Sequence, residues 1–499
     1  MVPAIRITRL NTRPVQEDGR FVLHWMTAYR RTRSNFALQR SVEWARELAK
    51  PLFVFDPLRA GYPWASDRFH SFVLDGMQDN ARRLEASGVT YYPYVEETAD
   101  AGKGLLEYLG SEACVVVADA FPGFFMPRMR AAAAKRLPVL LEEVDSNGLL
   151  PIRASDRAYA TAFAFRRHMQ QELPGHLQAA PAPDPLAGLR LPLLAELPSE
   201  LRVRWPRVSP KRLASRAWVE KLPIDHSVPP IAGARGGQEA AHETLSCFLS
   251  ESLHSYGDGR NHPDREVTSR LSPYLHFGHV SAHDIFRAVM ETEGWEPSRL
   301  SKAASGKRQG WWGVDAGAEA FLDQVTTWRE LGLNAASMMP AYDHYESLPT
   351  WARETLEQHA SDPRTHLYDV EELKQARTHD PVWNAAQRQL LTDGRIHNYL
   401  RMLWGKRILG WSPTPASALE RMIDLNNRYA LDGRDPNSYS GIFWCLGRYD
   451  RPWGPERPVF GKVRYMTSQN TARKLRLKEY LERYAGEDDA GDERGAPDA

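Results

Sequence analysis

The sequence predicts a doubly wound α/β domain at the N-terminus and an all-helical domain at the C-terminus. In residues 1–150, short apolar runs alternate with stretches of helical periodicity, which is typical of a parallel sheet covered by helices on both faces. From residue 238 to residue 484 the helical pattern is almost continuous. Between these parts the chain is rich in proline and glycine, as an interdomain connection is.

Five apolar runs, such as PLFVFDP and CVVVAD, predict the strands of the sheet. They cover residues 21–26, 51–57, 89–95, 114–119 and 138–145. Residues 34–49 and 67–85 have helical periodicity and are expected to be helices. The expected parts are an α/β domain (1–173), an irregular linker (174–237), a helical domain (238–484) and an acidic disordered tail (485–499).

The composition excludes several classes of protein. With 499 residues, 42% hydrophobic and 25% charged, the chain is ordinary globular material for two or more domains. Its three cysteines, Cys114, Cys247 and Cys445, lie far apart, which argues against a disulfide framework and cannot supply a four-cysteine iron–sulfur cluster. No apolar run approaches the roughly 18 residues of a membrane span. We expect a cytoplasmic monomer with no membrane partner and no metal.

Several sequence blocks resemble one known family. They are HWMTAYRRTRSNFAL, TSRLSPYLHFGHVSA and WREL, and then THDPVWNAAQRQLL, RMLWGKRILGW, LNNRYALDGRDPN and RPVFGKVRYM between His379 and Met466. In order and spacing these blocks resemble the photolyase and cryptochrome family, and most of all the class II cyclobutane pyrimidine dimer photolyases. The resemblance implies a helical domain that holds a U-shaped FAD beside a pocket for a flipped-out pyrimidine dimer in double-stranded DNA. It also implies an α/β domain that often holds an antenna chromophore, and no motif selects between a deazaflavin, a folate, a second flavin or none.

The predicted FAD site combines hydroxyls, an amide and an ion pair. Hydroxyls near a helix start suit a pyrophosphate, and plain N-capping is the alternative. The resemblance places Asn426, rather than its neighbour Asn427, at the flavin N5. It also places Arg401 and Asp432 as an ion pair near the isoalloxazine, where the residues alone would indicate a structural salt bridge. The other residues that it assigns to FAD are Tyr256, Thr268, Ser269, Leu271 and Ser272.

Two groups of tryptophans have predicted roles. Trp404 and Trp411 are seven residues apart in a helical stretch and so share a face, roughly 10 Å apart along the axis. With Trp383, they match the family's chain that carries electrons from the surface to FAD. Trp328 and Trp444 match the pair that flanks the flipped dimer, and Met402 matches a methionine at the same pocket. Core packing is the alternative for all six side chains.

The segment from Arg448 to Lys478 is basic and contains interleaved aromatic residues. Such a stretch is typical of a surface that contacts phosphates. The predicted DNA contacts are Arg448, Arg451, Arg457, Lys462 and Arg464. For the last four cations of the segment, a solvated helix face is an equal alternative.

One position departs from the class II pattern in a way that bears on function. Gln324 stands where the family has an acidic residue that contacts the lesion and stabilises its radical anion. An amide can still donate a hydrogen bond, but it cannot pass on a proton. In an α-helix neither Asp323 nor Glu330 would face the same way. Smaller departures are AASMM after Asn334, and Tyr449 in place of an expected histidine.

The sequence therefore supports a light-driven lyase that splits cyclobutane pyrimidine dimers, with repair weakened by Gln324. A cryptochrome-like photoreceptor or a non-repairing DNA-binding flavoprotein is the main alternative, and an enzyme acting on another lesion is a third. The lyase is favoured because a signalling protein would not need both Trp328 and Trp444. Restoring the acidic residue by Gln324→Glu should help to distinguish these hypotheses.

Overall fold

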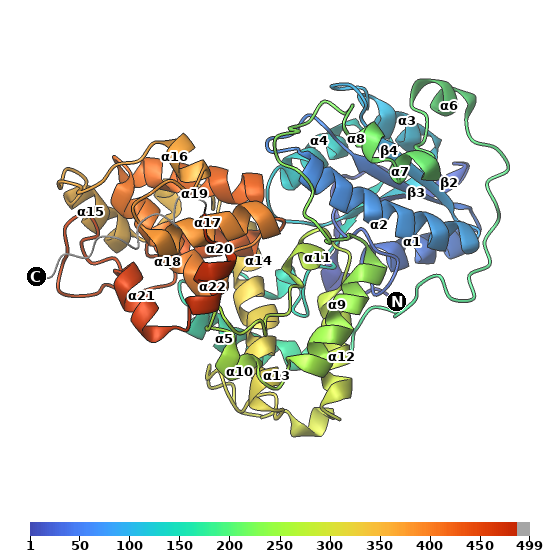
Figure 1. The fold of residues 1–499 in the computed structure, drawn as a ribbon. Coiled ribbons are helices and arrows are strands. Elements are labelled where there is room, and N and C mark those ends of the chain that lie inside the picture. Colours follow the sequence, from blue (N-terminus) through green and yellow to red (C-terminus); the bar gives the residue numbers. More distant parts are fainter. Residues whose placement is uncertain (487–499) are drawn as a thin grey trace, which may run out of the picture.

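A six-stranded sheet forms the centre of the N-terminal part of the chain (Figure 1). The computed structural model describes residues 1–486. The strands are β1 (Ile7–Arg9), β2 (Phe21–Trp25), β3 (Leu52–Leu58), β4 (Thr90–Val95), β5 (Ala113–Asp119) and β6 (Leu141–Val144). Their order is β1-β6-β5-β2-β3-β4, with β1 antiparallel to β6 and every other pair parallel. The five predicted strands are confirmed, and the edge strand β1 was not predicted because three residues are too short to show a pattern.

Helices cover both faces of this sheet, as the doubly wound prediction requires. Helices α1 (Phe36–Glu47) and α2 (Asp67–Ala86) pack on the face that includes Val22, whereas α3 (Leu105–Glu112) and α4 (Met126–Arg136) pack on the face that includes Leu23. Consecutive residues of β2 thus enter different cores, because side chains of a strand alternate between its faces. Strands buried on both sides explain why these segments are continuously apolar.

The chain between the sheet and the helical domain is more ordered than predicted. Helix α5 (Ala162–Glu172) contributes Phe165 and Met169 to the core of the helical domain. The proline-rich segment contains three short helices, α6 (Ser199–Arg204), α7 (Pro210–Leu213) and α8 (Arg216–Val219). Trp205 and Trp218 are buried against the α/β domain. Buried tryptophans therefore attach a segment whose composition alone indicated an irregular linker.

The C-terminal part is helical, as predicted. Its helices are α9 (Gln238–Glu251), α10 (Tyr256–Gly259), α11 (Ser272–His276), α12 (Ala282–Thr292), α13 (Ala316–Leu322), a π-helix (Asp323–Trp328), α14 (Arg329–Met338), α15 (Thr350–Gln358), α16 (Val370–Lys374), α17 (Pro381–Asp393), α18 (Asn398–Trp411), α19 (Pro415–Tyr429), α20 (Pro436–Cys445), α21 (Ser468–Lys474) and α22 (Lys478–Arg483). Glu330 on α14 joins this part to the α/β domain by accepting hydrogen bonds from the amides of Leu149 and Leu150.

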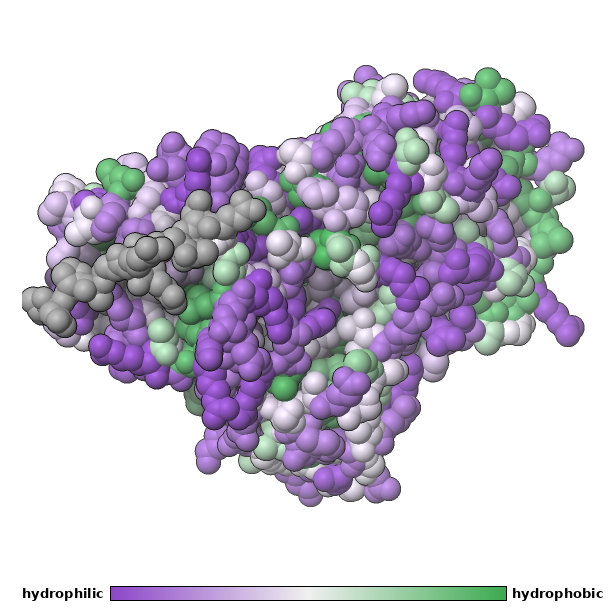
Figure 2. All heavy atoms as spheres, viewed as in Figure 1, coloured by the Kyte–Doolittle hydropathy of each residue, from purple (hydrophilic) through white to green (hydrophobic). Residues whose placement is uncertain are grey.

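Within residues 1–486, no helix has the length and apolarity needed to cross a bilayer, and no three His, Cys, Asp or Glu side chains of this part gather as metal ligands would. Apart from residues 485 and 486, the predicted acidic tail lies outside the described residues. On the face seen in Figure 2, apolar residues form small separate groups on a mostly hydrophilic surface.

Candidate functional site

A cavity of about 1350 Å³ in the helical domain brings most of the predicted site residues together. Its walls come mainly from α10, α11, the π-helix, α18 and α20. The predicted residues that line it are Tyr256, Thr268, Ser269, Leu271, Ser272, Gln324, Trp328, Arg401, Met402, Asp432, Trp444 and Arg464. Cavities for single drug-sized ligands measure roughly 300–1,000 Å³, so this cavity has room for more than one such group.

Hydrogen bonds link several residues of the cavity wall near Ser438. Arg401 Nη2 lies 3.5 Å from Asp432 Oδ1, and Arg401 Nη1 lies 3.4 Å from Ser438 Oγ. Asn426 Nδ2 donates to the same Ser438 oxygen at 2.8 Å. One network therefore holds the predicted ion pair and the predicted amide. We call Tyr256, Thr268, Ser269, Ser272, Arg401, Asn426 and Asp432 the polar set.

The two neighbouring asparagines differ in how their side chains are used. Asn427 is fully buried, donates to Tyr439 Oη at 2.9 Å and accepts from the backbone amide of Arg434 at 2.9 Å. The Oδ1 atom of Asn426 accepts no hydrogen bond within residues 1–486. Of the two, only Asn426 keeps a side-chain acceptor without a described partner, although its side chain is buried and does not line the cavity.

The hydroxyls before α11 do not cap that helix. Its N-cap residue is Leu271, and no side chain forms a cap hydrogen bond. Ser269 Oγ accepts a long hydrogen bond, 3.4 Å, from the amide of Leu271. The hydroxyls of Thr268 and Ser272 bond to no other group in the described part of the chain. The N-capping alternative is therefore wrong, and these hydroxyls remain available to a ligand in the cavity.

Gln324 and Trp328 lie on the π-helix rather than on the α-helix that we expected. Single turns of π-helix occur often at functional sites. At about 4.4 residues per turn, two residues four positions apart still share a face, and both side chains line the cavity. The Gln324 amide makes no hydrogen bond to any described residue. We call Gln324, Trp328, Met402 and Trp444 the tryptophan set.

Neither nearby acidic residue can replace the missing carboxyl group. Asp323 forms a bidentate ion pair with buried Arg166, at 2.7 and 3.1 Å. Glu330 is buried among the amides of Leu149 and Leu150, and burial raises its pKa to about 7. Neither side chain lines the cavity, which agrees with the expectation that they do not substitute for Gln324.

Charged and aromatic groups surround Trp444. Arg464 lies 5.3 Å from the ring centroid of Trp444, and its guanidinium is bound by Asp450 at 2.8 and 3.1 Å. Tyr449, where histidine was expected, has a φ of 64° and lines the same cavity. The arrangement leaves a half-buried tryptophan face inside a polar opening.

The three predicted electron-transfer tryptophans lie in contact behind the cavity. Trp383 Nε1 donates to the backbone carbonyl of Trp404 at 3.0 Å, and the rings of Trp383 and Trp411 meet edge to face at 5.4 Å. Trp383 on α17 therefore lies between two tryptophans of α18. Trp411 is only 3% exposed, and it contacts half-buried Tyr368 and exposed His379. The sequence had suggested that these three tryptophans lead from the surface to FAD. In the structure, the tryptophans alone do not reach the surface.

The predicted DNA contacts separate into buried and exposed side chains. Arg448 is 3% exposed and donates to the carbonyl of Tyr342 at 2.8 Å, so burial removes it from the residues that can reach a phosphate. Arg451 and Arg457 are exposed and stack on aromatic rings, at 4.6 and 5.1 Å from Trp453 and Tyr465. Lys462 is also exposed and pairs with Glu456.

The cavity wall is strongly basic, a feature that the sequence analysis missed in part. Nine arginine or lysine side chains line it against three aspartates. Besides Arg401 and Arg464, the basic residues are Arg166, Arg260, Arg270, Lys307, Arg308, Arg329 and Arg395. The only sequence signal for Lys307 and Arg308 was a short KR pair in SGKRQG. Arg166, Arg270 and Arg395 are paired with carboxylates that do not line the cavity. Arg260, Lys307 and Arg308 form no ion pair in the described residues, and their positive charge favours anionic ligands.

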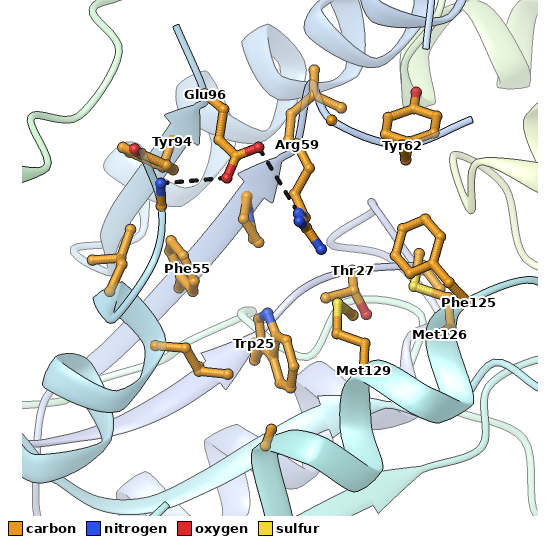
Figure 3. A pocket seen from close by; sticks show the side chains of 18 of the residues that line it. Trp25, Thr27, Phe55, Arg59, Tyr62, Tyr94, Glu96, Phe125, Met126 and Met129 are labelled. Atoms are coloured by element: carbon orange, nitrogen blue, oxygen red, sulfur yellow. Dashed lines mark hydrogen bonds and ion pairs between the residues drawn. The ribbon is translucent and has the colours of Figure 1, made fainter. Parts of the chain in front are cut away.

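A second cavity of about 670 Å³ lies in the α/β domain (Figure 3). Its wall contains Trp25 at the end of β2 and Phe121 just after β5, the two strands between which the chain changes direction across the sheet. Ligands of doubly wound sheets bind at this position. Figure 3 shows Phe55, Tyr62 and Phe125 around the opening. The composition of this wall suits a flat aromatic ligand.

Comparisons with known proteins agree with this geometry. The deoxyribodipyrimidine photo-lyase of Methanothermobacter thermautotrophicus is 34% identical over 490 residues, covering 97% of this chain and 99% of that protein. The deoxyribodipyrimidine photo-lyase of Oryza sativa is 33% identical, covering 93% and 87%. A bacterial class III photolyase structure from Agrobacterium tumefaciens matches with a TM-score of 0.66 over 96% of this chain and 87% of that one; at 16% identity it shows the fold alone. No protein-family model matches the chain.

The fold is the photolyase architecture, a sheet domain joined to a helical domain with a large cavity. The chain belongs to the deoxyribodipyrimidine photo-lyase family. It is thus a DNA-repair flavoprotein of the photolyase type.

Proposed function

We propose that this protein splits cyclobutane pyrimidine dimers in double-stranded DNA under blue light, with FAD held in the large cavity. The observation that supports this most is that one cavity is lined by the tryptophan set and by every member of the polar set except Asn426, which is hydrogen-bonded to Ser438 of the wall. A flavin site and a base-sized aromatic pocket must open to each other for an electron to pass between their occupants.

The polar set fits FAD. The free hydroxyls of Thr268 and Ser272, within a basic wall, suit a pyrophosphate. The carboxylate of Asp432 and the guanidinium of Arg401 would orient the ring system, and Asn426 would accept or donate at its reactive nitrogen. When bound, reduced FAD supplies one electron to the lesion on excitation by light.

The tryptophan set fits a flipped-out pyrimidine dimer. Trp328 and Trp444 offer aromatic faces, and stacking contributes roughly 1–3 kcal/mol per base. Met402 would fill the space beside Arg401, since both side chains approach Gly441. Gln324 would donate to a carbonyl of the lesion but has no proton to give. Repair is therefore expected to occur at a reduced rate.

Residues outside the two sets would supply electrons, contact DNA and hold an antenna chromophore. Trp404, Trp383 and Trp411 form the contact path along which electrons would reach the cavity. Arg451, Arg457, Lys462 and Arg464 would face the DNA, whereas Arg448 belongs to the interior. The second cavity is the proposed antenna site, because it is apolar, aromatic and lies at the change of strand direction.

Gln324 also supports a second candidate, a photoreceptor or non-repairing flavoprotein with a relaxed lesion pocket. The deciding experiment uses purified, photoreduced protein and an oligonucleotide with one cyclobutane thymine dimer. Chromatography would follow the restored thymines under blue light. Turnover supports the lyase. No turnover in protein whose absorption spectrum shows reduced FAD would favour the photoreceptor or a different lesion.

A further inference from the structure

Lys406 on α18 is a cation in the interior of the helical domain. Its side chain is fully buried, and Nζ donates one hydrogen bond, at 2.7 Å, to the carbonyl of Cys445. No carboxylate in residues 1–486 lies within ion-pair distance of this ammonium. Burial lowers its pKa to about 8, so the group is still mostly charged at neutral pH. A buried charge without a counterion is costly, and its presence calls for an explanation.

The ammonium lies against Trp444, the residue that the proposed function places beside the lesion. Nζ is 5.4 Å from the centroid of the Trp444 ring. Trp444 lines the cavity but Lys406 does not, so the charge lies on the protein side of this wall. Arg464 also lies over Trp444, but Asp450 neutralises it. Lys406 therefore supplies the uncompensated positive charge at this ring.

The tryptophans of the proposed electron path have different surroundings. Trp404 Nε1 donates to the amide oxygen of Gln387 at 2.9 Å, and Trp383 Nε1 donates to a backbone carbonyl. No cation lies over either ring in the described residues. Arg407 lies over Trp411, but it is bound to Asp380 at 2.9 Å. Acceptor oxygens favour loss of an electron from an indole, whereas an adjacent cation opposes it.

We propose that Lys406 is a positioning residue that prevents Trp444 from acting as an electron donor. This inference depends on the proposed function. In photoreduction of oxidised flavin, Trp404 is oxidised by one electron to its radical cation, the flavin gains that electron, and no proton needs to move. The same reaction at Trp444 would create a positive charge beside the Lys406 ammonium in a region of low dielectric constant. Electrons are thus drawn from one side of the cavity, and Trp444 stays intact as the wall of the lesion pocket.

The test measures the excited-state lifetime of oxidised FAD in the holoprotein by time-resolved fluorescence. Trp404→Phe should lengthen the lifetime about tenfold, which corresponds to about 1.4 kcal/mol, because the nearest donor is lost. Adding Lys406→Met should shorten it again at least severalfold as Trp444 becomes a donor. Adding Trp444→Phe to that pair should restore the long lifetime. Lys406→Gln, which keeps a donor for the Cys445 carbonyl, should act like Lys406→Met, and Lys374→Met on the surface should change nothing.

The possible failures are distinct. If Trp404→Phe lengthens the lifetime and neither Lys406 variant shortens it, the inference about Lys406 is wrong and the electron path stands. If Trp444→Phe alone lengthens the lifetime, Trp444 is already a donor and the inference is wrong. A lifetime that none of the tryptophan variants changes would contradict the proposed electron path and the inference with it.

Discussion

The polar set and the tryptophan set meet at one cavity, which all of their members except Asn426 line, but the two sets are built differently. In the polar set, Arg401, Asn426 and Asp432 are tied together through Ser438. In the tryptophan set, Gln324 bonds to nothing in the described residues, and its π-helix replaces a regular helical turn. Two of the departures from the family pattern seen in the sequence, Gln324 and Tyr449, line the cavity with the second set.

This difference indicates which of the two sets can change in sequence without losing its function. A network with few free atoms accepts one ligand in one orientation, because any change leaves a buried polar group unpaired. Side chains that make stacking contacts and few hydrogen bonds tolerate substitution. We therefore expect flavin binding to be strict, and lesion recognition to be where this chain differs from its relatives.

Breaking the polar set should have the largest effect. Arg401→Leu leaves Asp432 without its cation and should weaken FAD binding about 100-fold, or about 2.7 kcal/mol. Flavin fluorescence released on dilution would measure the affinity. Arg428→Leu, which breaks ion pairs with Asp225 and Asp424 outside the cavity, is the matched control and should leave flavin binding unchanged. Equal losses in both variants would mean that the polar set has no special role.

Lys406 should change how the free energy of unfolding depends on pH. Because burial lowers its pKa to about 8, the unfolded chain holds a proton between pH 8 and the ordinary pKa of about 10.4 that the folded protein has released. Lys406 should therefore contribute a rise in the free energy of unfolding with pH over this window, of about 2–3 kcal/mol. The thiol of Cys445 acts in the opposite direction, because burial raises its pKa to about 11. The unfolded chain therefore loses this proton at a lower pH than the folded protein does, which lowers the free energy of unfolding as the pH rises.

Denaturant unfolding at pH 7.5 and pH 10 would test this statement. Lys406→Met should abolish the rise and should be no less stable than the parent at pH 7.5, because a buried unpaired charge is removed. Lys374→Met, at a residue paired with Glu371 on the surface, should keep the rise. If the stabilities of the parent and of Lys406→Met changed equally between these pH values, Lys406 would not carry the expected charge.

Truncation within the tryptophan set should separate lesion binding from flavin binding. Trp328→Ala and Trp444→Ala should each weaken binding of a dimer-containing oligonucleotide by about 1–3 kcal/mol. FAD content should not change, because neither residue belongs to the polar set. Fluorescence anisotropy with damaged and undamaged oligonucleotides gives both affinities. Equal weakening for the two oligonucleotides would count against stacking on the lesion.

Gln324→Glu sharpens the comparison by restoring the family's carboxyl group. Repair of a thymine dimer should become about tenfold faster, and the rate should depend on pH, because the new side chain titrates and an amide does not. Gln324→Ala is the control and should be slower than the parent protein. An unchanged rate in the glutamate variant would rule out Gln324 as the limit on repair.

Much of the fold could be predicted because strands buried on both faces leave continuous apolar runs in the sequence, as at Ala113–Asp119. The π-helix could not be predicted, since a one-residue change in helical register leaves no local signal at Asp323–Trp328. The residues of the candidate site were predicted from their match to family motifs, and most of them line one cavity in the structure. Arg448 was misplaced because a run of charges does not show which guanidinium turns inward.

The smallest expected effect concerns DNA binding by exposed Arg451 in comparison with Arg448, the arginine that the sequence wrongly placed at the DNA. Arg451→Ala should reduce the slope of log affinity against log salt by about 1, because this exposed cation meets DNA phosphates. Arg448→Leu should leave the slope unchanged and instead lower the free energy of unfolding by about 1–3 kcal/mol, since the Tyr342 carbonyl loses a buried donor. Binding of undamaged duplex between 50 and 200 mM salt, roughly the range in which such contacts are screened, would measure the slopes. If Arg448→Leu reduced the slope as much as Arg451→Ala, the buried position of Arg448 could not persist in the DNA complex.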